Sequence, residues 1–405
     1  MTVPHKTRGA RASAPDIAAA PRVRPASLEL PPYETVALVL QGGGALGAYQ
    51  AGVYQGLDEA GITPNWIAGI SIGALNAAVI AGNAPAQRVA RLLEFWETIC
   101  RPAGGLPLPG SVENWLFNLP DPARAALASW QATSALTSGQ HGFFTPRFPP
   151  PLPILAANPA SVSYYDTGHL KSTLERLCDF DRINSKEMRV SVGAVNVGTG
   201  NFAYFDNTKT CLRAEHFMAS GALPPGFPAV EIDGEYYWDG GLLSNTPLTE
   251  VLRPDEPRDS LVFQVDLWKA RGEVPRNMAE VAGRAKDIQY SSRTRLVTDS
   301  VREMQQFRSV LREVLEEVPD KVRKNAAWSK IAERLSCSKR YNVVHLIYQN
   351  QAYESHYKDY QFGLTTMQNH WQAGVHDMRS TLQHPHWFDM PDNQSGFVTH
   401  DLHQK

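Results

Sequence analysis

The chain has 405 residues, of which 43% are hydrophobic and 20% charged, an ordinary composition for a folded protein of about two to three domains, or of one large domain with an appendage. The formal net charge is -2, so a broad basic field is missing and no nucleic-acid partner is expected. No apolar run reaches the roughly 18 residues of a membrane-spanning helix, and no signal-type segment occurs, so the sequence predicts a cytoplasmic protein.

Residues 1–32 are rich in Ala, Pro and Arg and have no hydrophobic periodicity, which predicts a disordered tail. Strand and helix patterns then alternate. A buried strand is predicted at 34–40, a helix over 45–61, a strand at 65–70 and a buried helix over 72–82. This β-α-β-α order is typical of the opening of a three-layer α/β domain.

The segment 101–160 interrupts this order with eleven prolines and many aromatic residues. Long irregular insertions in compact domains often carry function, so this one is predicted to lie over a site or at a partner surface. A packed surface loop is the alternative that the sequence leaves open.

Regular patterns return after the insertion, with a helix predicted over 167–178, a hairpin over 188–206 and a buried strand at 260–268. The remaining residues, 269–405, are predicted to form a mainly helical C-terminal extension with one strand near 341–349.

The stretch QGGGALG (41–47) lies between the first strand and the first helix. Backbone N–H groups of such a loop can converge at a helix N-terminus and bind a phosphate or a developing oxyanion. The same stretch matches the dinucleotide fingerprint at Gly42, Gly44 and Gly47, but no acidic residue follows the second strand to hold a ribose. A nucleotide-binding module is therefore the alternative from another functional class.

The stretch GISIGAL (69–75) places Ser71 between Gly69 and Gly73, directly after a strand and before a helix. This is the context of a nucleophile elbow, in which the serine lies at the positive end of the following helix.

A serine hydroxyl becomes a good nucleophile when a neighbouring group accepts its proton. Asp239 follows a predicted strand and precedes Gly240 and Gly241, so a sharp turn would present its carboxylate, and burial by Tyr237 and Trp238 would raise its pKa. A turn-capping role for Asp239 is the alternative. Four late histidines fit the Ser-acid-His order but none follows a strand in a Gly-rich turn: His345, His356, His370 and His376.

The four cysteines lie far apart, and none is paired with another Cys or a His at metal-ligand spacing. They are therefore expected to be small buried side chains of a protein in a reducing compartment.

Three motifs, QGGGALGAYQAGV, GISIGALNAA and YYWDGGLLSNTPL, together resemble the patatin-like phospholipases in order and spacing, over about residues 34–268. Residues 352–378 look like an extension found in one bacterial subgroup of that family. The resemblance implies a three-layer α/β/α sandwich of the patatin type, with a catalytic domain over 33–268 followed by the extension.

The resemblance also implies a serine lipid acyl hydrolase, of phospholipase A or lysophospholipase type, with Ser71 as nucleophile and Asp239 as base and without a cofactor. Two sets of supporting residues follow: Gly42, Gly43, Gly44 and Ala45 as oxyanion donors, and Gly69, Gly73, Gly240 and Gly241 as elbow and turn supports.

One departure from the family affects the expected substrate. Many members carry Arg or Lys where this chain has Leu46, so a soluble short-chain carboxylesterase or thioesterase is the alternative to a lipase acting on phospholipid. The partner implied is a lipid or acyl-ester substrate. Peripheral contact with a membrane surface is a further option, although the helical run 284–318 mixes both charge signs, whereas interfacial helices favour a basic face.

Overall fold

The computed structural model describes residues 29–103, 112, 115, 120–151, 158–252, 257–291, 294–325, 327–336, 339–351, 354–392 and 396–403. Residues 1–28 of the predicted tail and parts of the 101–160 insertion lie outside this set.

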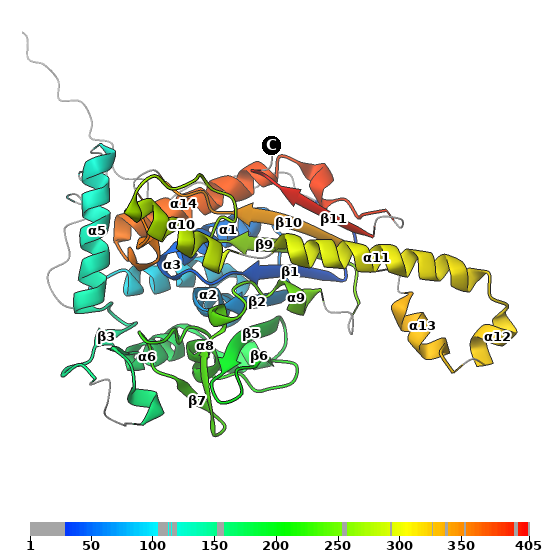
Figure 1. Ribbon diagram of the computed structural model, residues 1–405, viewed down its shortest axis with the longest axis horizontal. Coiled ribbons are helices and arrows are strands. Elements are labelled where there is room, and N and C mark those ends of the chain that lie inside the picture. The colour runs from blue at the N-terminus through cyan, green and yellow to red at the C-terminus, as the bar shows by residue number, and fades with distance from the viewer. Residues whose placement is uncertain are drawn as a thin grey trace, which may run out of the picture.

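The described residues form a central nine-stranded sheet, in the order β11-β10-β9-β1-β2-β5-β8-β7 with β6 paired to β5 (Figure 1). The pairs from β11 to β5 are parallel, and those of β5 with β6, β5 with β8 and β7 with β8 are antiparallel. The strands of this sheet are β1 Thr35–Leu40, β2 Trp66–Ile70, β5 Arg189–Asn196, β6 Phe202–Asp206, β7 Val230–Ile232, β8 Glu235–Asp239, β9 Ser260–Asp266, β10 Tyr341–Ile347 and β11 Phe397–Asp401. A separate small sheet pairs β3 Thr145–Pro146 with β4 Tyr165–Asp166.

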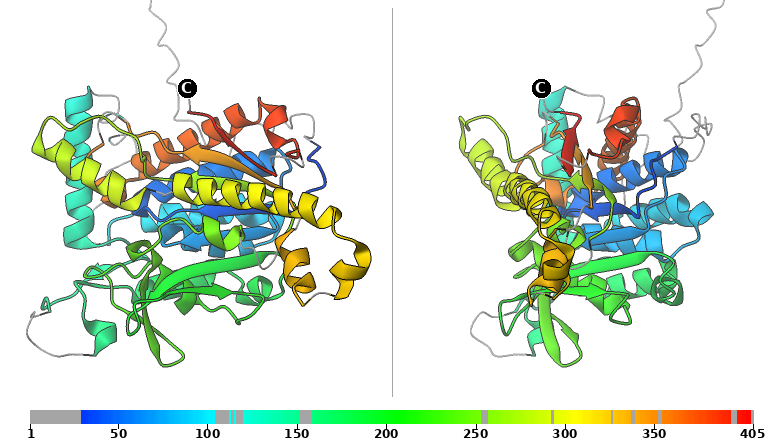
Figure 2. Two further views of the ribbon diagram at one scale, coloured as in Figure 1. Left: turned by 45° about the vertical axis from the view of Figure 1, so that its right-hand side comes forward. Right: turned by 90° about the vertical axis from the view of Figure 1, so that its right-hand side faces the viewer.

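Helices cover both faces of the sheet, so the fold is a three-layer α/β/α sandwich, as predicted (Figure 2). The helices are α1 Ala48–Glu59, α2 Ile72–Ala81, α3 Arg88–Ile99, α5 Asp121–Ser138, α6 Gly168–Leu177, α7 Phe180–Asn184, α8 Ala214–Ser220, α9 Leu248–Val251, α10 Met278–Tyr290, α11 Thr294–Glu316, α12 Asp320–Asn325, α13 Ser329–Leu335 and α14 Leu364–Thr381.

The two faces of β1 explain why its sequence is apolar without alternation. Leu38 and Leu40 pack into the larger core, under α1, α2, α3 and α14, whereas Ala37 and Val39 pack into a second core under α9 and α11. A strand with both faces buried has no polar side, which is typical of a parallel sheet between two helical layers.

The C-terminal part of the chain completes this same sheet. β10 pairs with β9, β11 pairs with β10, and α14 packs along α1. The sequence predicted one strand in this region, and that prediction missed β11. Because the hydrogen bonds of the sheet continue from β9 into β10, the C-terminal part shares one core with the residues that precede it.

The 101–160 insertion contains more regular structure than its prolines suggest. Helix α5 spans 18 of its residues and carries an Ala-rich sequence that favours a helix. The sequence analysis assigned no helix to this part of the insertion.

Candidate active site

The loops that carry the predicted site residues meet at one edge of the sheet. The Gly-rich loop follows β1, Ser71 follows β2, and β1 and β2 are parallel neighbours, so both loops leave the sheet at its carboxyl edge. Ligands of open α/β sheets bind at this edge.

Strand β5 brings Asp239 to Ser71. On one side of β5, both Val192 and Ala194 pair with β6. On its other side, Val192 pairs with β2 and Ala194 pairs with Asp239 of β8. Strands β2 and β8 therefore lie end to end along one edge of β5. β2 ends at Ile70, opposite Gly193, and β8 ends at Asp239, opposite the next residue, so Ser71 and Asp239 meet where the two strands end.

The backbone at Ser71 has a strained conformation at the turn from β2 into α2. Its φ is 54° and its ψ is -126°, a positive-φ combination that is costly for a residue with a side chain. The Ser71 N–H donates to the Ser220 hydroxyl at 2.9 Å, and that hydroxyl donates to the Gly193 carbonyl at 2.6 Å. This buried relay ties the turn to α8 and β5 and holds the strained residue in place.

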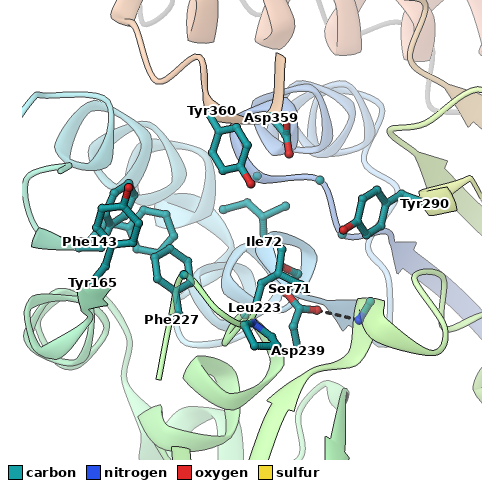
Figure 3. Close-up of a pocket in the computed structure, with 18 of the residues that line it drawn as sticks. Ser71, Ile72, Phe143, Tyr165, Leu223, Phe227, Asp239, Tyr290, Asp359 and Tyr360 are labelled. Carbon is teal, nitrogen blue, oxygen red and sulfur yellow. Dashed lines mark hydrogen bonds between the residues drawn. The ribbon is translucent and has the colours of Figure 1, made fainter. Parts of the chain in front are cut away.

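The carboxylate of Asp239 is buried beside the serine. Asp239 is 3% exposed, and its Oδ1 accepts a hydrogen bond from the Gly241 N–H at 2.7 Å. Burial raises the pKa of Asp239 to about 7, although the hydrogen bonds from the Gly241 N–H and the Ser71 side chain act in the opposite direction. Figure 3 shows the two side chains facing each other. A carboxylate that titrates near neutrality can accept a proton from a hydroxyl.

The glycines beside Ser71 and Asp239 allow close backbone contacts. A Cβ on Gly73 would lie 2.3 Å from the Leu40 carbonyl oxygen, and one on Gly69 would lie 2.5 Å from the backbone of Gly73. A Cβ on Gly240 would lie 2.8 Å from the Gly193 carbonyl oxygen, and one on Gly241 would lie 3.0 Å from Asn245 Oδ1. Side chains at these positions would push β2, α2 and the Asp239 turn apart.

The Gly-rich loop presents its backbone to the same space, but its residues differ in what they can donate. The Gly42 N–H already donates to the Asn245 carbonyl at 3.1 Å. It is therefore not free to bind an oxyanion, and the prediction of Gly42 as a donor is corrected. Gly43 and Gly44 line the cavity beside Ser71 at the start of a short 3-10 helix, Gly44–Gly47. Ala45 is 2% exposed and lies behind them. Leu46 is fully buried in the core and cannot present a side chain to a ligand.

Asn245 connects three segments around the loop. Its Nδ2 donates to the Gly42 carbonyl at 3.0 Å and to the Tyr290 carbonyl at 2.9 Å. The Gly42 carbonyl also accepts from Trp268 Nε1 at 2.8 Å. Asn245 therefore links the Gly loop, the Asp239 turn and the end of α10.

A cavity of about 320 Å³ opens over Ser71 and Asp239, at the lower end of the size range of small-ligand sites. Its two ends differ in chemistry (Figure 3). One end is apolar and aromatic, with Phe143, Phe144, Tyr165 and Phe227 in ring contacts, joined by Phe362. The other end carries Trp268, Tyr290, Asp359 and Tyr360.

Among the described residues of the 101–160 insertion, Leu136, Phe143 and Phe144 line this cavity. Trp115, Trp130 and Phe148 are outside its lining and are 63%, 52% and 96% exposed. A small part of the insertion therefore forms the pocket wall.

Comparisons with known proteins identify the family. A family model described as patatin-like phospholipase matches residues 38–252, which are 215 of the 405 residues. The chain belongs to the patatin-like phospholipase family. A second family model, described as patatin phospholipase, matches residues 288–394. A search of curated proteins found no match.

Three solved structures of low sequence identity are similar to this patatin-like chain. VipD from Legionella pneumophila is 16% identical, with a TM-score of 0.37, over 86% of this chain and 67% of that one. The type III effector protein ExoU is 13% identical, with a TM-score of 0.34, over 89% of this chain and 55% of that one. Human GIVD cytosolic phospholipase A2 is 12% identical, with a TM-score of 0.30, over 57% of this chain and 42% of that one.

Family membership makes this chain a lipid-ester hydrolase of the patatin-like type. Among the described residues, no group of three His, Cys, Asp or Glu side chains is placed to hold a metal ion. None of the described helices combines the length and the apolar character that crossing a bilayer requires.

The patatin-like site includes residues that the sequence did not point to. Ser220, Trp268, Tyr290, Asp359 and Phe362 all contact the site or line it, yet none belongs to a recognisable motif. Two weak signals were present. Trp268 is the last residue of the strand predicted at 260–268, and Ser220 lies in ASGALPPGFPAVEIDG, a stretch similar to a segment between the motifs in bacterial members of the family.

Proposed function

We propose that this protein is a serine acyl hydrolase that cleaves carboxylic esters of lipids through a Ser71–Asp239 dyad. The observation that carries the proposal is a buried carboxylate with a pKa of about 7 facing a serine held at positive φ, in the floor of a largely apolar cavity.

The first half of the reaction forms an acyl-enzyme. Ser71 Oγ attacks the ester carbonyl carbon while Asp239 takes the hydroxyl proton, and the negative charge of the tetrahedral intermediate develops on the former carbonyl oxygen. The N–H groups of Gly43 and Gly44 stabilise this oxyanion. The intermediate then collapses, the C–O bond of the ester breaks, and the alcohol leaves with the proton from Asp239.

The second half releases the fatty acid. Water attacks the acyl-enzyme carbonyl while Asp239 again accepts a proton, and the carboxylic acid departs as Ser71 regains its hydrogen. The aromatic end of the cavity, with Phe143, Phe144 and Phe227, suits the acyl chain, because apolar rings bury it from water.

The proposal is tested with p-nitrophenyl esters of increasing chain length, with and without lipid vesicles. The wild type is expected to prefer esters of medium or long acyl chains. The variants Ser71→Ala and Asp239→Asn are expected to be inactive. A clear preference for acetyl or butyryl esters, unaffected by vesicles, would instead support the short-chain esterase suggested by Leu46. Loss of activity in Ser71→Ala alone, with Asp239→Asn active, would contradict the dyad.

We also propose a peripheral contact with a lipid surface near the cavity. Leu242 and Leu243 directly follow the Asp239 turn and are 45% and 59% exposed, and α10, which ends at the cavity residue Tyr290, exposes Met278 and Ile288. Apolar side chains at such positions can enter the interface of a bilayer. Replacing both leucines by Ser is expected to reduce co-sedimentation with phosphatidylcholine vesicles without changing hydrolysis of a water-soluble ester. Equal co-sedimentation of the two proteins would contradict the contact.

A further inference from the structure

The C-terminal extension lies directly against the Gly-rich loop. Gly44 has a φ of 56°, and a Cβ there would lie 2.3 Å from the carbonyl oxygen of Asp359. Asp359 is held in turn by Lys286, whose Nζ lies 2.7 Å from both of its carboxylate oxygens. The loop that receives the oxyanion in the proposed function is therefore covered by residues more than 300 positions away in the chain.

A buried hydrogen-bonded pair of the extension, His370 and Glu354, reaches the same loop. His370 of α14 is 1% exposed, its Nε2 lies 2.7 Å from Glu354 Oε1, and its Nδ1 lies 3.3 Å from the carbonyl oxygen of Ala45. Glu354 also accepts from the Tyr348 hydroxyl at 2.8 Å and from the Gln351 N–H at 2.9 Å. These hydrogen bonds fix the carboxylate, and the carboxylate fixes the imidazole ring.

Both ring nitrogens of His370 face an acceptor oxygen, one of a carboxylate and one of a carbonyl. A neutral imidazole has one N–H, so both contacts can be hydrogen bonds only if the pair holds a second proton between Nε2 and Glu354 Oε1. The Nδ1–H group is then the donor to the Ala45 carbonyl. The side chains of His370 and Glu354 are both buried, so water does not compete for this contact.

The Ala45 carbonyl is a sensitive point of the loop. The peptide unit between Ala45 and Leu46 is planar, and its other end, the Leu46 N–H, donates to the Gly43 carbonyl at 3.2 Å. A donor on the Ala45 carbonyl therefore restrains this peptide at both ends, and with it the orientation of the preceding N–H groups. Oxyanion donors act through being aligned before the reaction begins, so their orientation affects the rate.

We propose that Glu354 and His370 are positioning residues for the oxyanion loop. Through the Ala45 carbonyl they hold the N–H groups of Gly43 and Gly44 in the orientation that receives the oxyanion. This inference rests on the proposed function, and it gives the extension a role in the chemistry: the segment matched at 288–394 organises a loop that belongs to the segment matched at 38–252.

Three variants of the full chain test the proposal. His370→Gln keeps an amide near Nε2, toward Glu354, but withdraws the donor from Ala45. His370→Asn places an amide near Nδ1 and can restore part of that contact. The matched control is Trp371→Phe, which removes the buried hydrogen bond of 2.6 Å from the indole Nε1 of α14 to Gln55 of α1, ten residues beyond Ala45.

The expected result for His370→Gln is a fall in kcat of about 10- to 100-fold with KM changed by less than about threefold, because a misaligned oxyanion donor affects the transition state more than the bound substrate. His370→Asn should recover part of kcat. Trp371→Phe should lower the melting temperature but leave kcat near that of the wild type.

A second readout does not depend on activity. Amide hydrogen exchange of the peptide that contains residues 42–47 is expected to accelerate in His370→Gln and to stay at the wild-type rate in Trp371→Phe. Unchanged exchange and kcat in His370→Gln, or equal losses in the two variants, would overturn the positioning role. If exchange accelerates while Ser71→Ala hydrolyses esters as well as the wild type, the contact holds the loop but the proposed function is wrong, and the catalytic role of the contact falls with it.

Discussion

Replacing Asp239 with Asn should abolish activity and yet stabilise the protein, and the stabilisation should depend on pH. The pKa of Asp239 rises from 3.8 to about 7 on folding. This rise of about three units corresponds to about 4 kcal/mol, the free energy by which ionisation of the buried carboxyl opposes folding. Asn cannot ionise, and its amide oxygen can still accept from the Gly241 N–H.

The direction of this pH dependence follows from whether the folded or the unfolded chain binds the proton. Below about pH 4 the carboxyl is protonated in both the folded and the unfolded chain, so the wild type and Asp239→Asn should differ little through this group. Between about pH 4 and pH 7 only the folded chain keeps the proton, and the wild type loses about 1.4 kcal/mol of stability per pH unit relative to Asp239→Asn. Above pH 7 the difference should level off.

Urea denaturation at a series of pH values from 5 to 8, followed by tryptophan fluorescence, measures this difference. Ser71→Ala is the control, because it is also expected to be inactive but keeps the carboxyl, so its stability should fall with pH as in the wild type. In parallel, kcat/KM of the wild type should rise with pH through about 7 as Asp239 ionises. A stability difference that is small and independent of pH would refute the argument that burial makes Asp239 a base.

Three further changes test the supports of the site. Gly44→Ala should prevent correct packing and abolish hydrolysis, because its Cβ would lie 2.3 Å from the Asp359 carbonyl oxygen at a positive φ; expression yield and circular dichroism measure this. Ser220→Ala should lower the free energy of unfolding by about 1–3 kcal/mol and reduce kcat, because it leaves the Ser71 N–H without its acceptor. Phe143→Ala should shift the preference among p-nitrophenyl esters toward longer or bulkier acyl chains, because it enlarges the aromatic end of the cavity.

For each of these variants, one result would contradict the prediction. An active, well-folded Gly44→Ala would show that the extension can move away from the loop without loss. For Ser220→Ala, unchanged melting and rate would mean that the turn does not need its relay. Trp130→Ala is the control for Phe143→Ala, since Trp130 lies in the same insertion and is 52% exposed, and an equal shift in the two variants would exclude a specific role of the pocket wall.

The local sequence was sufficient to predict the residues of the candidate site that lie at the ends of strands. Ser71 between Gly69 and Gly73, and Asp239 before Gly240, could be found because a strand, a tight turn and a helix follow one another within a few residues. The end-to-end placement of β2 and β8 on β5 could not be found this way, because it depends on pairings between residues far apart in the chain.

Other features were hidden for identifiable reasons. β11, Phe397–Asp401, is mostly half-buried and mixes polar with apolar residues, so its sequence resembles a loop. Tyr290 and Asp359 reach the cavity only because α10 and the turn before α14 fold back onto the Gly loop. The role of Gly42 as an oxyanion donor was expected from its motif, but the Asn245 carbonyl already accepts its N–H. The location of the protein in the cell stays a prediction.

The pairing of β9 with β10 has a consequence for attempts to shorten the protein. A chain cut after Trp268 would keep Ser71 and Asp239, but β9, whose apolar residues are now buried, would become an open edge that offers unpaired N–H and C=O groups to other molecules. Such an edge promotes intermolecular strand pairing, so the shortened chain should form aggregates visible by light scattering. The part of the chain that carries the motifs, up to Trp268, is therefore not expected to fold as a separate enzyme.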